Sequence, residues 1–185
     1  PLTKKERNHL VGKLNRYFDH NILIYELYPM QDEAHARFNA QGRTYQYHVS
    51  QTKQPFKDAF CYYYPWRLDI NKMNQAAALL IGRKDFTSFS KLHTQVNNNI
   101  CTLTDALWEE KDGELVFTIR ANRFLRNMVR AVVGTLLAVG RGKITMEEFI
   151  QIMECKDRCK AGTSVPAKAL FLCKVEYPEE LFLKE

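Results

Sequence analysis

The first part of the chain has the amphipathic pattern of a helix. Thr3 and Glu6 have the spacing of a capping box, in which a hydroxyl and a carboxylate satisfy the first backbone N–H groups of a helix. Apolar residues then recur at helical spacing as far as Phe18. The apolar run at residues 22–25 predicts a short buried strand after this helix.

Alternation of apolar and polar residues dominates the following part. The pattern over residues 36–49 predicts two strand segments, with a bulge or turn at Gly42 between them. A period of two places Tyr45 and Tyr47 on the same face of the second segment. Aromatic residues then crowd residues 56–66, where a proline favours an edge strand or a loop.

Cap and turn residues delimit the next elements. Asp69 can cap a helix that ends at Gly82, and the polar residues 84–99 are expected to form a loop. The Asp-Gly pair at residues 112–113 predicts the turn of a hairpin. The strands of that hairpin are expected at residues 100–108 and 115–121.

The second half of the chain contains its most apolar element, a predicted long helix over residues 123–139. Thr145 and Glu148 form the cap of another helix, and residues 170–177 predict a closing strand. Strands grouped in hairpins with helices between them predict an α+β fold, with a mainly antiparallel sheet and helices packed on one face.

Composition narrows the class of protein. The 185 residues are 45% hydrophobic and 12% aromatic, which excludes a disordered, collagen-like or coiled-coil chain. No apolar stretch reaches the length of a membrane span, so we expect a cytoplasmic protein. The five cysteines lack the paired spacing of a zinc site, and the histidines show no metal spacing, so we predict no metal.

The positive charge is unevenly distributed. The formal net charge is +6, and residues 115–146 contain five arginines and one lysine but no acid. Such a concentration suits a polyanion such as RNA or DNA. Arg130 lies at the border of the apolar face of the long helix, where a guanidinium requires an anionic partner. That partner is either a carboxylate from a distant part of the chain or an external anion.

Tyr45 and Tyr47 lie beside Arg43 in the predicted strand. Two interpretations are open. The tyrosines can form a stacking surface for an unpaired base, with Arg43 binding phosphate. Alternatively, they are ordinary half-buried residues of a sheet.

Four segments in order resemble the tRNA pseudouridine synthase A family. They are HARFNAQGRTYQY at 35–47, GRKDFTSF at 82–89, ANRFLRNMVRAVVGTLLAVGRGK at 121–143 and KDRCKAGTSVPAKALFLCKVEY at 156–177. The resemblance implies an isomerase that converts uridines of the tRNA anticodon arm to pseudouridine, without cofactor or metal, and that acts as a homodimer. It also implies the C-terminal half of the pseudouridine synthase fold. One departure is Ala169, where the family commonly has glycine.

The resemblance also implies roles for single residues. Tyr45 matches the tyrosine that packs on the target uracil, and Arg130 matches the arginine that pairs with the catalytic aspartate. The family places that aspartate in a G-R-T-D-x-G-V-H segment, which these residues do not contain; Asp105 lacks the flanking residues. The basic residues expected to contact the tRNA backbone are Arg37, Arg43, Lys84, Arg123, Arg126 and Arg141.

By the same resemblance, residues 1–34 are expected to be the end of a connection between domains, and residues 35–185 the C-terminal catalytic and RNA-binding domain. The N-terminal domain with its nucleophile is absent, so the chain alone should be inactive. Two alternatives remain. The chain can be a non-catalytic RNA-binding module derived from such an enzyme, or a self-contained acid–base enzyme that uses Asp85 or His93.

Overall fold

The computed structural model describes residues 2–91 and 98–183. The chain divides into two units. The smaller unit contains the residues up to Asn39 together with those from Tyr177 onward, and the larger unit is Ala40–Glu176. Each unit is described by itself.

In the smaller unit, the first predicted helix is confirmed as α1 (Lys4–Tyr17). The capping box forms as expected, because the Thr3 hydroxyl accepts from the Glu6 backbone N–H and the Glu6 carboxylate accepts from that of Thr3. Near the C-terminal end of the unit, a 3-10 turn (Glu179–Leu181) leads into an isolated bridge between Phe182 and Met30.

The predicted buried strand at residues 22–25 is wrong. These residues form no strand, and the Leu23 side chain is 60% exposed. Instead of pairing with a strand, the Ile24 backbone pairs with the side chain of Asn15, whose Oδ1 accepts from the Ile24 N–H and whose Nδ2 donates to the Ile24 carbonyl, both at 2.8 Å. A polar side chain from α1 thus satisfies the backbone groups that a neighbouring strand would otherwise bind.

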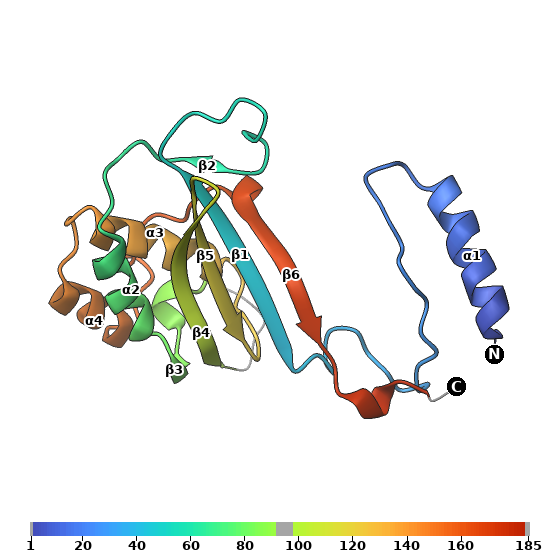
Figure 1. Cartoon of the computed structure of the whole chain (residues 1–185). Helices are drawn as coiled ribbons and strands as arrows, with labels where there is room; N and C mark the ends of the chain where they lie inside the picture. Colours follow the sequence, from blue (N-terminus) through green and yellow to red (C-terminus); the bar gives the residue numbers. More distant parts are fainter. Residues whose placement is uncertain (1, 92–97, 184–185) are drawn as a thin grey trace. The chain divides into compact units, whose positions relative to one another are not determined.

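The larger unit is built on a six-stranded sheet (Figure 1). Its strands are β1 (Gly42–Ser50), β2 (Tyr62–Tyr63), β3 (Gly82–Asp85), β4 (Ile100–Lys111), β5 (Glu114–Ala121) and β6 (Leu170–Glu176). The order is β2-β1-β5-β4-β3, and β6 also pairs with β1. Only the short β1–β2 pairing is parallel. The expected mainly antiparallel sheet is therefore confirmed.

Three helices cover one face of this sheet: α2 (Ile70–Ala78), α3 (Met128–Gly140) and α4 (Met146–Glu154) (Figure 1). Asp69 caps α2 by accepting from the Lys72 backbone N–H, and Thr145 begins α4 with a capping box, as predicted. The core lies between helices and sheet. Its largest fully buried members are Trp108, Tyr47, Phe86, Phe89, Phe117, Phe149, Met73, Leu80, Leu103, Ile119, Met128 and Leu136. The fold is α+β, as predicted.

The hairpin of β4 and β5 also forms as predicted. Asp112 and Gly113 connect its strands with φ angles of 51° and 75°, and the left-handed region favours an Asp-Gly pair at such a turn. Both strands are longer than expected, because Lys111 pairs with Glu114 directly at the turn.

Three local predictions need correction. Gly42 is the first residue of β1, and the strand segment predicted before it does not form, because residues 36–39 form turns and a bend instead. The irregularity lies between Thr44 and Tyr45, where the register with β6 shifts. The first two residues of the predicted loop, 84 and 85, belong to the edge strand β3. No pattern in the neighbouring sequence indicates that β3 pairs with β4. The long helix begins at Met128, five residues late, because Asn127 before it has a left-handed φ of 68°.

Candidate functional site

Tyr45 lies in the middle of the sheet, on the strand between β5 and β6. Its register partners are Ile119 on β5 and Leu172 on β6. The ring meets Phe124 edge-on, with centroids 5.2 Å apart and an interplanar angle of 90°. Leu172 beside it is 51% exposed, and Tyr45 itself is partly exposed. The ring is thus held by an aromatic contact and remains accessible.

Tyr47, on the same face of β1, has a different environment. It is fully buried, and its hydroxyl donates to the Pro166 carbonyl at 2.8 Å. Burial raises the pKa of Tyr47, while the nearby Arg130 charge acts in the opposite direction. For Tyr47 the ordinary structural interpretation therefore holds, and a stacking role is excluded because no base can reach a buried ring.

Arg130 lies in the first turn of α3. Its Nε donates to the Val165 carbonyl at 2.6 Å, and its own carbonyl accepts from the Val165 N–H at 3.2 Å. The guanidinium is partly buried. Within residues 2–91 and 98–183, no carboxylate lies at ion-pair distance from it, so the internal salt bridge that could have neutralised it is not found there.

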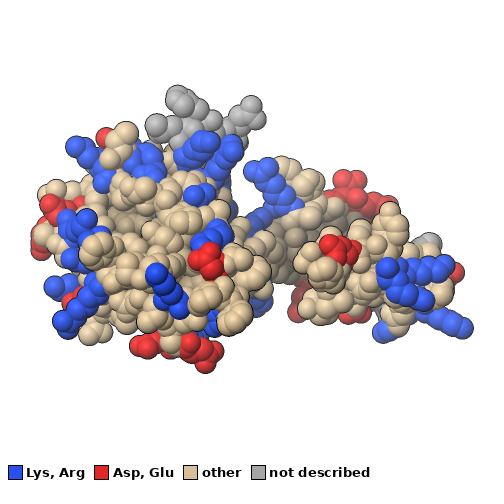
Figure 2. Space-filling model, turned by 90° about the horizontal axis from the view of Figure 1, so that it is seen from above, with Lys and Arg blue, Asp and Glu red and all other residues tan. Residues whose placement is uncertain are grey.

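Four of the predicted tRNA contacts gather at one end of the sheet. The register places Arg43, at the start of β1, opposite Ala121, at the end of β5. Arg123 and Arg126 follow directly on from β5, and Lys84 lies in β3, which ends beside the start of β4. Arg43 is partly fixed there, because its Nη1 donates to the carbonyls of Ala40 and Asn122. On the face of the larger unit seen in Figure 2, Lys and Arg side chains form several patches.

The other two predicted contacts belong to other elements. Arg37 is part of the smaller unit, where its guanidinium lies 5.6 Å from the centroid of the Phe38 ring. Arg141 follows the C-terminal end of α3. Within the larger unit, four of the five predicted basic residues thus lie on elements that meet at one end of the sheet.

Arg141 takes part in an aromatic arrangement that sequence reasoning missed. Its guanidinium lies over the Trp66 ring, 4.2 Å from the centroid, and borders a cavity of about 400 Å³. Lys143 supplies a second positive charge, and no acidic residue of the described ranges lines the cavity. The remaining lining residues are Tyr62, Tyr64, Gly134, Leu137, Ala138, Ile144, Gly162, Thr163, Ser164, Val165 and Pro166. The only feature of the sequence that pointed to this arrangement was the crowding of aromatic residues around Pro65.

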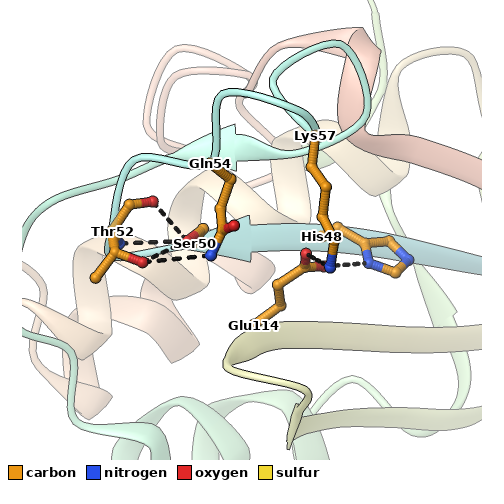
Figure 3. Close-up of polar contacts among 6 residues, drawn as sticks. All are labelled: His48, Ser50, Thr52, Gln54, Lys57 and Glu114. Atoms are coloured by element: carbon orange, nitrogen blue, oxygen red, sulfur yellow. Dashed lines mark hydrogen bonds and ion pairs between the residues drawn. The ribbon is translucent and has the colours of Figure 1, made fainter.

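A buried carboxylate was also missed. The Glu114 side chain is only 8% exposed and lies 2.7 Å from Lys57 Nζ and 3.0 Å from His48 Nδ1 (Figure 3). Burial acts to raise the pKa of Glu114, but the hydrogen bonds and charges of Lys57 and His48 outweigh it and hold that pKa below the usual value. The cluster fastens the loop that contains Lys57 to the start of β5, which is a structural role.

Asp85 has structural partners for both of its carboxylate oxygens. Its Oδ1 accepts from the Thr87 backbone N–H at 2.9 Å and from the Thr87 hydroxyl, and its other oxygen pairs with Lys156 at 3.2 Å. Burial acts to raise the pKa of Asp85, yet the Thr87 and Lys156 contacts hold it below its usual value. A carboxylate used in this way is a poor general acid. His93, its predicted alternative, lies outside the described residues.

Among the residues that the structure describes, no cluster of three or more His, Cys, Asp or Glu residues could hold a metal ion. Over the same residues, every helix is too short or too polar to cross a membrane.

Comparison with known proteins gives a consistent result. A family model described as tRNA pseudouridine synthase matches residues 76–178. A tRNA pseudouridine synthase A of Parabacteroides distasonis is 56% identical over 173 residues, which cover 94% of this chain and 69% of that protein. The protein of the same name from Bacteroides thetaiotaomicron is 54% identical over 179 residues, 95% of this chain and 66% of that protein.

The chain thus spans about two thirds of the length of these curated relatives. The residues that match the family model run from α2 to just beyond β6, and they include Arg130 and the segment that binds it. Identity above one half over nearly the whole of the present chain cannot arise from a shared fold alone. The chain therefore belongs to the tRNA pseudouridine synthase A family.

Proposed function

We propose that these residues are the C-terminal part of a tRNA pseudouridine synthase, which isomerises uridine to pseudouridine in the anticodon arm of tRNA. The proposal rests on the environment of Arg130. This partly buried guanidinium has its Nε on the Val165 carbonyl and no carboxylate partner among the described residues. Such a group needs an anion, and a nucleophilic aspartate from an N-terminal half supplies one.

Arg130 would keep that aspartate ionised. Its Nε is occupied by Val165, and neither Nη group donates to any group within the described part of the chain, so both can bind a carboxylate oxygen. An adjacent positive charge lowers the pKa of a carboxylate, typically by 1–3 units, and the anion is the nucleophilic form. The guanidinium therefore favours the charge state that attacks the ribose or the base.

Tyr45 would support the target uracil. An enzyme that acts on a base must first take that base out of its stack, and an aromatic ring offers a flat surface for it. Phe124 fixes the Tyr45 ring edge-on, while the exposed Leu172 lies at its other side. Breaking the N-glycosidic bond and rejoining the base through carbon requires neither oxidant nor reductant, so the base must only be held while it turns.

The basic residues would bind the tRNA backbone. Arg43, Lys84, Arg123 and Arg126 lie on elements that meet at one end of the sheet, and Arg141 and Lys143 line the cavity. Phosphate contacts of this kind position the RNA without reading its sequence. We assign the enzyme to the cytoplasm as a homodimer, and sedimentation of the enzyme with and without tRNA tests the dimer.

The experiment requires the complete enzyme, meaning a chain in which these residues follow the family's N-terminal half. Rejoining uracil through C5 displaces the hydrogen there, so tRNA with tritium at C5 releases it on turnover. We expect release by the complete enzyme and its loss in Arg130→Met. Arg67→Met is the matched control, because Arg67 is exposed and is not among the residues assigned to the pocket or to the tRNA backbone. Full activity of Arg130→Met would contradict the proposal.

A further inference from the structure

One segment crosses α3 beside Arg130 and is joined to that helix by several hydrogen bonds. We call residues 158–166 the crossing segment. Its Gly162 N–H donates to the Thr135 hydroxyl at 2.9 Å, and its Val165 holds the Arg130 side chain and backbone. A side chain at Gly134 would overlap the Thr163 carbonyl oxygen, so helix and segment touch through their backbones. The position of Arg130 thus depends on this segment.

Arg158 is the residue that shapes the crossing segment. Its Nη1 donates to the carbonyls of Ala161 at 3.4 Å and Gly162 at 3.2 Å, and its Nη2 donates to the Ser164 hydroxyl at 2.8 Å. The guanidinium is partly buried, and no carboxylate within the described residues pairs with it. It therefore folds residues 161–164 around itself and presents Val165 to α3.

A second contact couples this arrangement to the start of α3. Asn127 Nδ2 donates to the same Ser164 hydroxyl at 2.6 Å. Asn127 has a φ of 68° and immediately precedes the first helical residue, so the Ser164 hydroxyl links Arg158 to the point at which the helix begins. Arg130 lies three residues further on. Two connections, through Val165 and through Asn127, thus run from Arg158 to Arg130.

We propose that Arg158 is a positioning residue for Arg130. It holds the crossing segment so that the Val165 carbonyl orients the Arg130 guanidinium toward its anionic partner. The inference rests on the proposed function, because it assumes that Arg130 acts on the catalytic aspartate. In this role Arg158 acts on Arg130 through its own segment, because the donors it uses face Ala161, Gly162 and Ser164.

The first test is Arg158→Met in the complete enzyme. A misplacement of about 1 Å at a reacting group can cost about 100-fold in rate, so we expect kcat to fall by about 10- to 100-fold while KM for tRNA changes less than about threefold. The acid limb of the pH profile should move to higher pH, because an aspartate that loses its cation has a higher pKa. Lys160→Met is the matched control, since Lys160 is exposed and its substitution removes the same charge from the same segment.

Ser164→Ala provides a second, milder test, because it deletes only the hydroxyl shared by Arg158 and Asn127. We expect the same lowered kcat and the same shift of the pH profile, smaller in size, with rescue by Ser164→Thr, which keeps the hydroxyl. Thermal unfolding of each variant gives the folded fraction, by which kcat is corrected.

Each other outcome overturns the inference in a recognisable way. If Arg158→Met lowers the melting temperature but leaves the corrected kcat and pH profile unchanged, Arg158 is only structural. If KM rises at constant kcat and the salt dependence of binding weakens, Arg158 is an RNA contact. If Arg130→Met is also fully active, the proposed function fails first; if Arg130→Met is inactive while Arg158→Met is not, only the present inference fails.

Discussion

Gly134→Ala is expected to destabilise the larger unit, although alanine is the better helix former. A Cβ on Gly134 would overlap the Thr163 carbonyl oxygen and lie 3.0 Å from the carbon of that carbonyl. The obstacle is backbone, fixed on both sides by the hydrogen bonds of Gly162 and Val165 to α3, so it cannot rotate away.

The magnitude follows from opposing terms. Alanine gains about 1 kcal/mol of helix propensity over glycine. Overpacking costs about 1–3 kcal/mol, and displacing the crossing segment weakens hydrogen bonds worth about 1 kcal/mol each. We expect a net loss of about 2 kcal/mol, which corresponds to a melting temperature lower by about 4–8 °C.

The assay is urea or thermal unfolding followed by tryptophan fluorescence. Both tryptophans, Trp66 and Trp108, belong to the larger unit, so the signal reports on that unit. Gly12→Ala is the matched control: Gly12 lies in α1 of the smaller unit with no atom near its missing Cβ, and the tryptophan transition should not move. A Gly134→Ala variant as stable as the wild type would refute the close approach of helix and segment.

Three other predictions concern the buried carboxylate, the aromatic support and the basic patch. Glu114→Gln should destabilise the larger unit by about 1–2 kcal/mol, because the ion pair with Lys57 is lost. The loss stays small because the Lys57 side chain is half exposed and water can solvate its charge. Since the folded-state pKa of Glu114 is depressed, this difference is present above the unfolded pKa of about 4.3 and should disappear as pH falls through the lower folded value. A difference unchanged in acid would contradict the assignment, as judged from urea unfolding at several pH values. Tyr45→Ala in the complete enzyme should lower kcat by at least about 100-fold in the tritium assay and weaken tRNA binding much less; equal loss in both would make Tyr45 a binding residue only. Arg126→Ala should weaken binding and reduce the slope of log K against log salt by about 1, and an unaltered slope in a filter-binding titration would remove Arg126 from the RNA surface.

Local signals in the sequence predicted local structure well. The capping residues Thr3, Asp69 and Thr145 begin their helices, and the Asp-Gly pair forms the hairpin turn, because each involves contacts within four residues. The run at residues 22–25 failed because hydrophobicity alone does not supply a pairing partner. Likewise, β3 is a strand only because β4, which lies far along the chain, pairs with it.

The candidate site was predicted unevenly for the same reason. The sequence indicated that Arg130 needs an anion, since its helix is apolar and no acid lies nearby in the chain. It could not indicate Glu114, whose partners His48 and Lys57 are 66 and 57 residues away, nor the stacking of Arg141 on Trp66. Base stacking on Tyr45 and a basic surface for a polyanion were one interpretation of the residues themselves, whereas their specific roles toward tRNA came from the family resemblance; all of these roles remain predictions.

The most direct measurement compares the 185-residue chain with the complete enzyme on the same tRNA. We predict that the chain alone binds tRNA, with an affinity that falls steeply with salt, and releases no tritium from C5, whereas the complete enzyme releases it. If the chain alone released tritium, and Arg130→Met abolished that release, the nucleophile would lie within these residues. Such a result would contradict the claim that Arg130 pairs with an aspartate from outside them.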